Sequence, residues 1–289
     1  MYRLDRDHVK EVFKTYTDAY DSSDPKIALK IEHTYHVAEV ADQIAMSLNF
    51  SKEDQDLAWL LGMLHDIGRF EQVRRYGTFI DAKSIAHALM SCQVLFPEAY
   101  QVKEHFFDEM PNGRMGRVED YLKGMTEEAC PKDWPQLIHN AISLHSAFRL
   151  PKDQSERERL FSSILRDADK VDIFRVNIET PLTDIINCTE EEIRCSDTSL
   201  AVEEAMKEHH VVQRRADYIM TAADHIASHV CLAFELTFPK GREIAMEQGY
   251  LKQLLEFRNE SRVTCDLMEK MEREVESYFA QHANDIIYF

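Results

Sequence analysis

Residues 57–68, LAWLLGMLHDIG, decide how this chain folds. Leucine recurs here at the three- and four-residue steps of one helix face, at Leu57, Leu60, Leu61 and Leu64. The run ends on an imidazole next to a carboxylate, His65 and Asp66. His65 follows Leu61 by four residues, so it borders the buried stripe. The sequence predicts a helix that ends near this pair, with Gly68 as its left-handed C-terminal cap.

Helical spacing continues along the rest of the chain. Gly and Pro number 8 each, which is roughly half their usual combined share of ~7% Gly and ~5% Pro. Few sharp turns and no convincing alternating pattern argue against a sandwich, barrel or propeller, so the expected fold class is all-α. The helical patterns cover residues 37–48, 57–64, 82–96, 134–148, 156–176, 200–238, 243–257 and 263–280. Asn49 and Ser51 are expected to end one helix and to start the next.

The charge excludes several classes of partner. Asp+Glu number 52 against 34 Lys+Arg, so the net charge is −18. A broad nucleic-acid surface or an anionic membrane surface needs clustered Lys and Arg, so neither partner is expected. The most apolar late stretch, residues 219–238, holds charged side chains and is too polar for a membrane span. The 6 cysteines are scattered without a CxxC pair, which indicates reduced thiols and a cytoplasmic protein.

Ionisable side chains on apolar helix faces are the candidate site. His33 precedes Val37 by four residues, and Asp169 follows Leu165 by four, so both are expected to face inward. His87 and His145 also lie within helical patterns. Each histidine alone could be an ordinary core residue. Together with Asp66 they form a mixed N/O ligand set that suits Fe, Mn, Co, Ni or Zn better than Ca or Mg.

The order of these residues resembles the HD-domain superfamily of metal-dependent phosphohydrolases. The resemblance rests on EHTYHVAEVA (32–41), LGMLHDIGRF (61–70) and LRDADKVDIF (165–174). YGTFIDAKSIAHA (76–88) and AISLHSAFRLP (141–151) resemble the branch with two further histidines and a dinuclear centre. The resemblance covers about residues 30–180 and extends more loosely to about residue 260.

The resemblance implies an HD-domain helical bundle with additional C-terminal helices. Residues 1–180 would form the metal-binding core with an N-terminal helix, and residues 181–289 a helical extension packed on it. Residues 103–133 are irregular. They are expected to form either a lid over the site or a surface insertion without a role. No clear apolar stripe for a dimer is evident, so the oligomeric state stays open.

The resemblance also assigns metal ligands. The cofactor would be one or two divalent transition metal ions, with Mg as a further option. The first ion would be held by His33, His65, Asp66 and Asp169, and the second by His87, His145 and a bridging Asp66. Ser146 stands where related proteins often carry a second polar ligand-type residue, and the HHE…GYP signature is absent. The second position is therefore less well supported than the first.

Charged residues next to these ligands are candidates for catalysis and substrate binding. Asp66, Arg69 and Lys170 are predicted as catalytic, because phosphoryl transfer needs cations for its spread negative charge. The predicted substrate-binding residues are Arg69, Arg149, Lys170 and His36. Solvated helix ends are the ordinary alternative for the lysine and arginines.

The expected function is hydrolysis of a phosphoester of a small phosphorylated metabolite or nucleotide. Two alternatives remain. An HD-type di-iron oxygenase uses the same ligands, and a non-catalytic nucleotide-sensing HD module would be marked by a lost ligand, which is not the case here. The net charge does not oppose a phosphate, because residues 65–87 and 149–175 each carry a net charge of +1.

Overall fold

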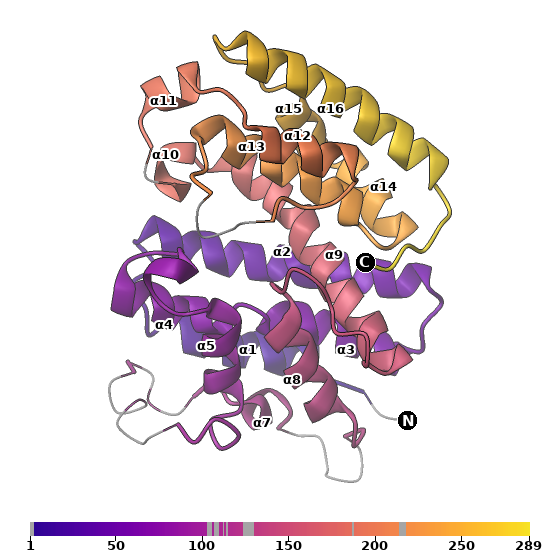
Figure 1. Ribbon diagram of the computed structural model, residues 1–289. Helices are drawn as coiled ribbons and strands as arrows, with labels where there is room; N and C mark the ends of the chain where they lie inside the picture. The colour runs from indigo at the N-terminus through magenta and orange to yellow at the C-terminus, as the bar shows by residue number, and fades with distance from the viewer. Residues whose placement is uncertain are drawn as a thin grey trace. The chain divides into compact units, whose positions relative to one another are not determined.

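The computed structural model describes residues 3–102, 106, 110–111, 113, 115–123, 130–186, 188–213 and 218–289. Every regular element in these residues is a helix and none is a strand (Figure 1). The predicted all-α fold is therefore confirmed. The chain divides into two compact units, Met1–Ala168 and Asp169–Phe289. A domain boundary at residue 180 and the packing of a C-terminal extension on the core stay predictions.

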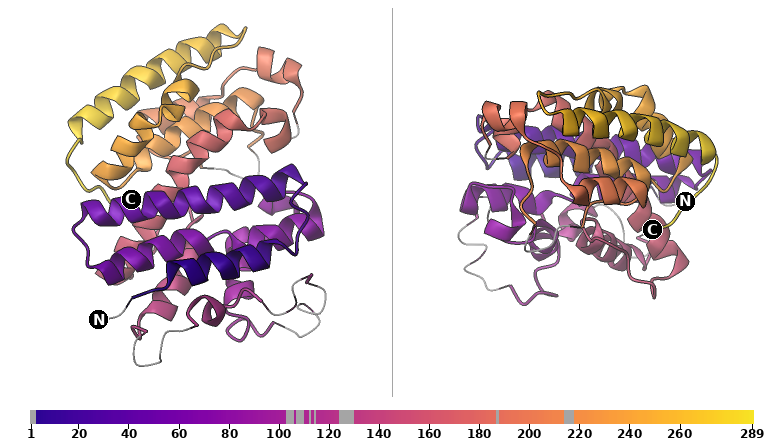
Figure 2. Two further views of the ribbon diagram at one scale, coloured as in Figure 1. Left: turned by 180° about the vertical axis from the view of Figure 1, so that it is seen from behind. Right: turned by 45° about the horizontal axis from the view of Figure 1, so that its top comes forward.

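The N-terminal unit holds most of the predicted site. Its helices are α1 (Arg6–Thr17), α2 (Pro25–Ser47), α3 (Lys52–Leu64), α4 (Ile67–Tyr76), the short 3-10 helix η1 (Asp81–Lys83), α5 (His87–Leu95), α7 (Val118–Tyr121), α8 (Trp134–Leu144) and the first part of α9 (Glu156–Glu179). Helix α2 packs along α3 (Figure 2). Helix α4 packs on α5, and α5 packs on α8. The four leucines of α3 are completely buried, as their spacing predicted.

The turn between α2 and α3 follows the sequence. Asn49 adopts a left-handed conformation with φ 55°, which its short polar side chain tolerates better than most residues do. Ser51 then caps α3 by accepting a hydrogen bond from the backbone N–H of Asp54. Both predicted boundary residues are confirmed.

Gly68 does not have the predicted role. Helix α3 ends at Leu64 and α4 begins at Ile67, so Gly68 lies in the first turn of α4. The left-handed cap is Gly77, with φ 65°, at the end of α4. Gly68 is required for a different reason: a Cβ atom there would lie 2.3 Å from the backbone nitrogen of Ser91. Its absence lets the backbones of α4 and α5 touch.

The C-terminal unit is also helical. It contains the rest of α9, then α10 (Leu182–Ile185), α11 (Glu190–Cys195), α12 (Leu200–Lys207), α13 (Ala222–Val230), the 3-10 helix η2 (Cys231–Glu235), α14 (Pro239–Glu247), α15 (Tyr250–Leu255) and α16 (Arg262–Gln281). The pattern predicted over residues 200–238 is not one helix. Helix α12 stops at Lys207, and His209 has φ 52°, which a continuing helix cannot accommodate.

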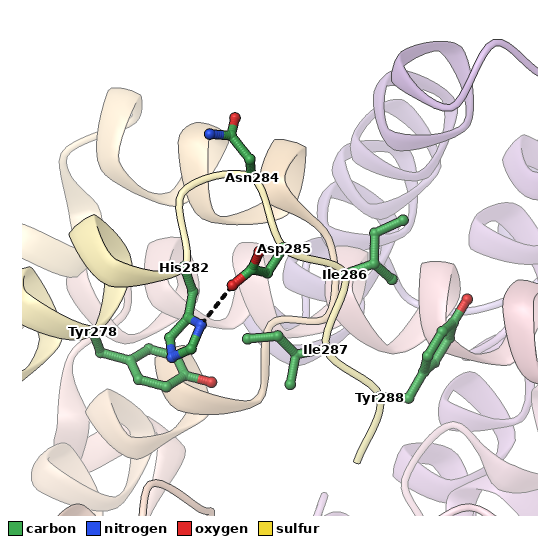
Figure 3. A pocket seen from close by; sticks show the side chains of 7 residues that line it. All are labelled: Tyr278, His282, Asn284, Asp285, Ile286, Ile287 and Tyr288. Carbon is green, nitrogen blue, oxygen red and sulfur yellow. Dashed lines mark hydrogen bonds and ion pairs between the residues drawn. The ribbon is translucent and has the colours of Figure 1, made fainter.

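The end of the chain folds back onto the C-terminal unit. The backbone N–H of Ile287 donates to the carbonyl of Thr237. Figure 3 shows the hollow beside this segment, where His282 and Asp285 pair at 2.9 Å. The other lining residues are Tyr278, Asn284, Ile286, Ile287 and Tyr288. None of the predicted ligands lines this hollow, so it is separate from the expected chemistry.

The predicted lid and the expected lack of a membrane span can be compared with the described residues. The predicted lid at 103–133 lies partly outside the described residues. Within it, α7 buries Val118 and Tyr121. Among the helices that the structure describes, none combines the length and the apolar character needed to cross a bilayer.

The contact at Gly68 leads to a stability prediction. Gly68→Ala should lower the free energy of unfolding by about 3 kcal/mol, because the methyl group meets backbone that cannot yield. Gly77→Ala is the matched control. Nothing lies within 4 Å of a Cβ there, so only the left-handed backbone is penalised, by about 1 kcal/mol. Urea denaturation of the metal-free proteins measures both, and equal losses would contradict the packing role.

Candidate metal centre

Two groups of buried side chains share one carboxylate. The first group is His33, His65 and Asp66, and the second is Asp66, His87 and His145. Within each group the potential ligand atoms all lie within 4.8 Å of one another. His33 comes from α2, the His65–Asp66 pair joins α3 to α4, His87 begins α5, and His145 follows α8. Five helices, α2, α3, α4, α5 and α8, thus bring these side chains together.

The two oxygens of Asp66 face different imidazole pairs. Oδ2 lies 3.5 Å from Nε2 of His65 and 3.7 Å from Nε2 of His33. Oδ1 lies 3.7 Å from Nε2 of His145 and 3.9 Å from Nε2 of His87. Within the pairs, the Nε2 atoms are 3.3 Å apart for His33 and His65, and 3.0 Å apart for His87 and His145. The carboxylate is therefore placed to bridge two positions.

Backbone carbonyls orient two of the imidazoles. Nδ1 of His65 lies 2.8 Å from the carbonyl oxygen of Gly62, and Nδ1 of His145 lies 2.7 Å from that of Ile142. A carbonyl can only accept, so each Nδ1 carries the proton and donates it. In the neutral form of such an imidazole Nε2 carries the lone pair, which is the arrangement a metal-ligating histidine needs.

A carboxylate orients the third imidazole. Nδ1 of His87 donates to Oδ2 of Asp81 at 2.6 Å. Burial tends to raise the pKa of Asp81, but the hydrogen bond from His87 and the charge of Arg69 outweigh it and lower the pKa to about 2. Burial, aided by Arg69, lowers the pKa of His87 to about 4. At neutral pH the pair is therefore an ionised carboxylate and a neutral imidazole whose Nε2 carries the lone pair.

Asp66 is kept ionised although it is buried. Burial alone would raise its pKa, but Lys30, His65 and Arg69 together hold the pKa well below its usual range. Nζ of Lys30 donates to Oδ2 at 2.6 Å, and Nε of Arg69 lies 3.5 Å from Oδ1. Lys30 was not predicted from the sequence. Its only signal is its position three residues before His33 on α2.

The residues fit a bound cation. Oδ1 of Asp66 is buried and accepts no hydrogen bond from the described part of the chain, which is costly for a carboxylate without a cation. Imidazole lone pairs surround it. This set of nitrogen and oxygen donors suits divalent transition metals. The cluster therefore indicates divalent metal binding.

Arg166 is a second residue that the sequence reasoning missed. Its Nη1 donates to the carbonyl oxygens of Leu144 at 3.2 Å and His145 at 3.1 Å. The last carbonyls of a helix have no partner within it, so the buried guanidinium of Arg166 satisfies the end of α8. This fixes the backbone that carries His145. Arg166 and His145 are 21 residues apart in sequence, and no local pattern connects them.

The other predicted site residues remain predictions. Asp169 and Lys170 lie on α9 at the start of the C-terminal unit, where Asp169 is half-buried and Lys170 is buried. Arg149 is exposed after α8, with its guanidinium 4.3 Å from the centre of the Phe148 ring. His36 is half-buried on α2, and its Nε2 lies 3.8 Å from Glu32.

Comparison with known proteins gives one result. Residues 31–174 match the HD domain family. The chain belongs to the HD-domain superfamily. No curated protein and no solved structure matches it. HD domains are mostly metal-dependent phosphohydrolases, so the match and the His/Asp cluster together indicate metal-dependent hydrolase-type activity. The superfamily resemblance noted over residues 30–180 is confirmed.

The low pKa of His87 predicts a pH effect on stability. In the metal-free HD domain, folded His87 stays neutral down to about pH 4, whereas the unfolded side chain takes up a proton below 6.5. Acidification from pH 6.5 to 5 should therefore lower the free energy of unfolding by about 2 kcal/mol. His87→Gln should remove this part of the pH dependence. Urea denaturation with a chelator at pH 6.5 and pH 5 measures the free energy of unfolding of both proteins. An equal change with pH in the wild type and in His87→Gln would contradict the assignment.

Proposed function

We propose that this protein is a metal-dependent phosphohydrolase that cleaves a phosphoester of a small phosphorylated metabolite or nucleotide. The supporting observation is the Asp66 carboxylate, which directs one oxygen to each of two imidazole pairs within an HD domain. His33, His65 and Asp66, with the predicted Asp169, would hold one ion. Asp66, His87 and His145 would hold a second. Such ions, when bound, lower the pKa of a coordinated water and neutralise charge on a phosphoryl oxygen.

Asp66 would act only as a ligand. Its carboxylate stays ionised because Lys30 and Arg69 flank its two oxygens. It therefore has no proton to give to a leaving group at neutral pH. A proton donor for the leaving oxygen has to come from solvent or from another residue.

Lys30 is the best-placed contact for the substrate phosphate. Its ammonium has three donors, one of which bonds Asp66 at 2.6 Å, and it lies 5.4 Å from the centre of the Phe79 ring. The side chain is 15% exposed, so it reaches solvent beside the cluster. A cation in this position would bind a phosphoryl oxygen and stabilise its charge in the transition state.

Arg69 would shape the site around the phosphate. Its Nη1 donates to the carbonyl oxygen of Phe79 at 2.8 Å and to Oδ1 of Asp81 at 3.2 Å. Its guanidinium also lies 5.5 Å from the centre of the Phe79 ring. The Phe79 ring thus lies close to two cations, Lys30 and Arg69. Much of the hydrogen-bonding capacity of Arg69 is used to hold the segment after α4 in place.

Loss of the bridging carboxylate tests the proposed function. Asp66→Asn should lower kcat by more than ~100-fold, because outer-shell partners alone typically change metal affinity or activity 10–100-fold. Phosphate release from a panel of phosphoesters by Mn-loaded protein measures this. Asp18→Asn is the matched control, since Asp18 is an exposed carboxylate that pairs with the exposed Lys14.

The same assay separates the rival functions when it is repeated without oxygen. Hydrolysis should continue at the same rate. Product formation that stops without oxygen would favour the oxygenase, and metal binding without turnover of any phosphoester would favour the sensing module. Unchanged turnover in Asp66→Asn would contradict the hydrolase assignment.

Lys30→Met should raise KM for the phosphoester by about 10-fold, because a charged contact to the phosphate is lost. The metal content of the loaded protein should not change. Lys26→Met is the control, one turn earlier on α2. Steady-state kinetics with metal analysis checks the prediction. A drop in metal content with unchanged KM would instead assign Lys30 to holding the Asp66 carboxylate ionised for the metal.

A further inference from the structure

Among the histidines of the metal cluster whose Nδ1 partner is described, His87 is the one held by a side chain. His65 and His145 donate to backbone carbonyls of their own helices. Because these acceptors are backbone carbonyl oxygens, a side-chain substitution does not remove them. His87 instead donates to Asp81, a side chain of η1 that lies six residues earlier. The orientation of His87 therefore depends on whatever holds Asp81.

Asp81 is fixed at both oxygens. Oδ2 accepts from Nδ1 of His87 at 2.6 Å. Oδ1 accepts from Nε2 of Gln72 at 2.9 Å and from Nη1 of Arg69 at 3.2 Å. Gln72 and Arg69 both belong to α4, whereas His87 begins α5. One carboxylate thus connects two helices through the short segment between them.

Gln72 anchors that segment. It is completely buried, and its Nε2 lies 2.9 Å from Oγ of Ser84 and 2.9 Å from the carbonyl oxygen of Ile85. Its Oε1 accepts from Nη1 of Arg69 at 2.7 Å. A buried amide with these partners specifies a single position for residues 81–85. The contacts of Asp81 are therefore built into the fold and do not depend on a mobile surface side chain.

We infer that Asp81 is a positioning residue for the second metal position, formed by Asp66, His87 and His145. The inference rests on the dinuclear centre of the proposed function. A carboxylate that accepts from Nδ1 fixes the proton there and makes Nε2 a better ligand. Within the described part of the chain, His87 is the one proposed ligand that Asp81 contacts, so the first position should not depend on Asp81.

Two substitutions of Asp81 separate an effect on the tautomer of His87 from a simple loss of the contact with it. In Asp81→Asn the amide N–H can donate to Nδ1 of His87. That contact stabilises the tautomer with its proton on Nε2, which cannot bind a metal, as in the corresponding change of a catalytic triad. Asp81→Ala removes the contact altogether. Both changes should weaken the second position 10–100-fold.

Manganese is a direct probe of this inference. The wild type, Asp81→Asn, Asp81→Ala and the control Asp18→Asn are loaded with Mn²⁺, freed of excess metal and analysed for ions per chain. The wild type and the control should retain two ions with the electron paramagnetic resonance spectrum of a coupled pair. Both Asp81 variants should retain one ion with the spectrum of an isolated site. Thermal melting of the metal-free proteins checks that all four fold alike.

The outcomes distinguish this inference from the proposed function. Two ions in both Asp81 variants with unchanged affinity would overturn the role of Asp81 and leave the dinuclear centre intact. Loss of both ions would also overturn it, because the effect would not be specific to the second position. A wild type that retains a single ion would contradict the dinuclear centre itself.

The tautomer of His87 can also be measured in the wild type, and this test does not depend on the folding of a variant. The ¹⁵N chemical shifts of His87 in the metal-free protein report its tautomer, and a proton on Nδ1 is expected. A proton on Nε2 would overturn the inference. The side chain of Asp81 is 36% exposed, so both substitutions are expected to be tolerated by the fold.

Discussion

Asp66 carries a negative charge inside the protein, and neighbouring side chains of the N-terminal unit stabilise that charge. An ionised carboxylate loses several kcal/mol of hydration on burial unless cations and hydrogen-bond donors replace the water. Lys30 approaches one oxygen and Arg69 the other. Their charges keep the pKa of Asp66 well below its usual range in spite of the burial. Both oxygens consequently remain available as anionic ligands.

The imidazoles reach this carboxylate because two helix pairs approach unusually closely. Gly62 faces the backbone of Ala38, where a Cβ would lie 2.5 Å from the Cα atom. This contact draws α3 against α2 and allows the Nε2 atoms of His33 and His65 to lie 3.3 Å apart. Gly68 does the same for α4 and α5, which carry Asp81's partners and His87. A glycine within a helix costs about 1 kcal/mol relative to alanine, a cost that close packing at the site offsets.

The sequence was informative where the signal is local. Helical spacing correctly placed the leucines of α3 and His33 in the interior, because periodicity reports which side of a helix is buried. The cluster around Asp66 followed from the resemblance of short motifs, and the structure brings five of its six proposed ligands together. Gly68 was misassigned because a glycine after an apolar run has the same appearance whether it caps a helix or permits a contact.

Residues that act across the chain left no such signal. Lys30 meets Asp66 over 36 residues, and Arg166 meets the end of α8 over 21 or 22. A lysine or arginine on a helix is ordinarily solvated, so neither attracts attention in the sequence. Asp81 and Gln72 are close in sequence to His87, but their roles depend on how residues 77–86 fold back on α4. Their contribution becomes visible only with the three-dimensional contacts.

The net charge of −18 is compatible with a small phosphorylated substrate, because the charges close to the site matter more than the distant ones. Nearby cations stabilise the buried Asp66 for the same reason. Exposed acids such as residues 190–192 act through water, and salt screens them beyond about 8 Å. Lys30 and Arg69 act at short range where water is scarce and the effective dielectric constant is lower. With Asp66 and Asp81 they balance to zero, so any bound divalent ion makes the cluster positive. A compact phosphate would experience mainly that local charge, whereas a long polyanion would also meet the acidic surface. The charge distribution therefore favours a small substrate over a nucleic acid.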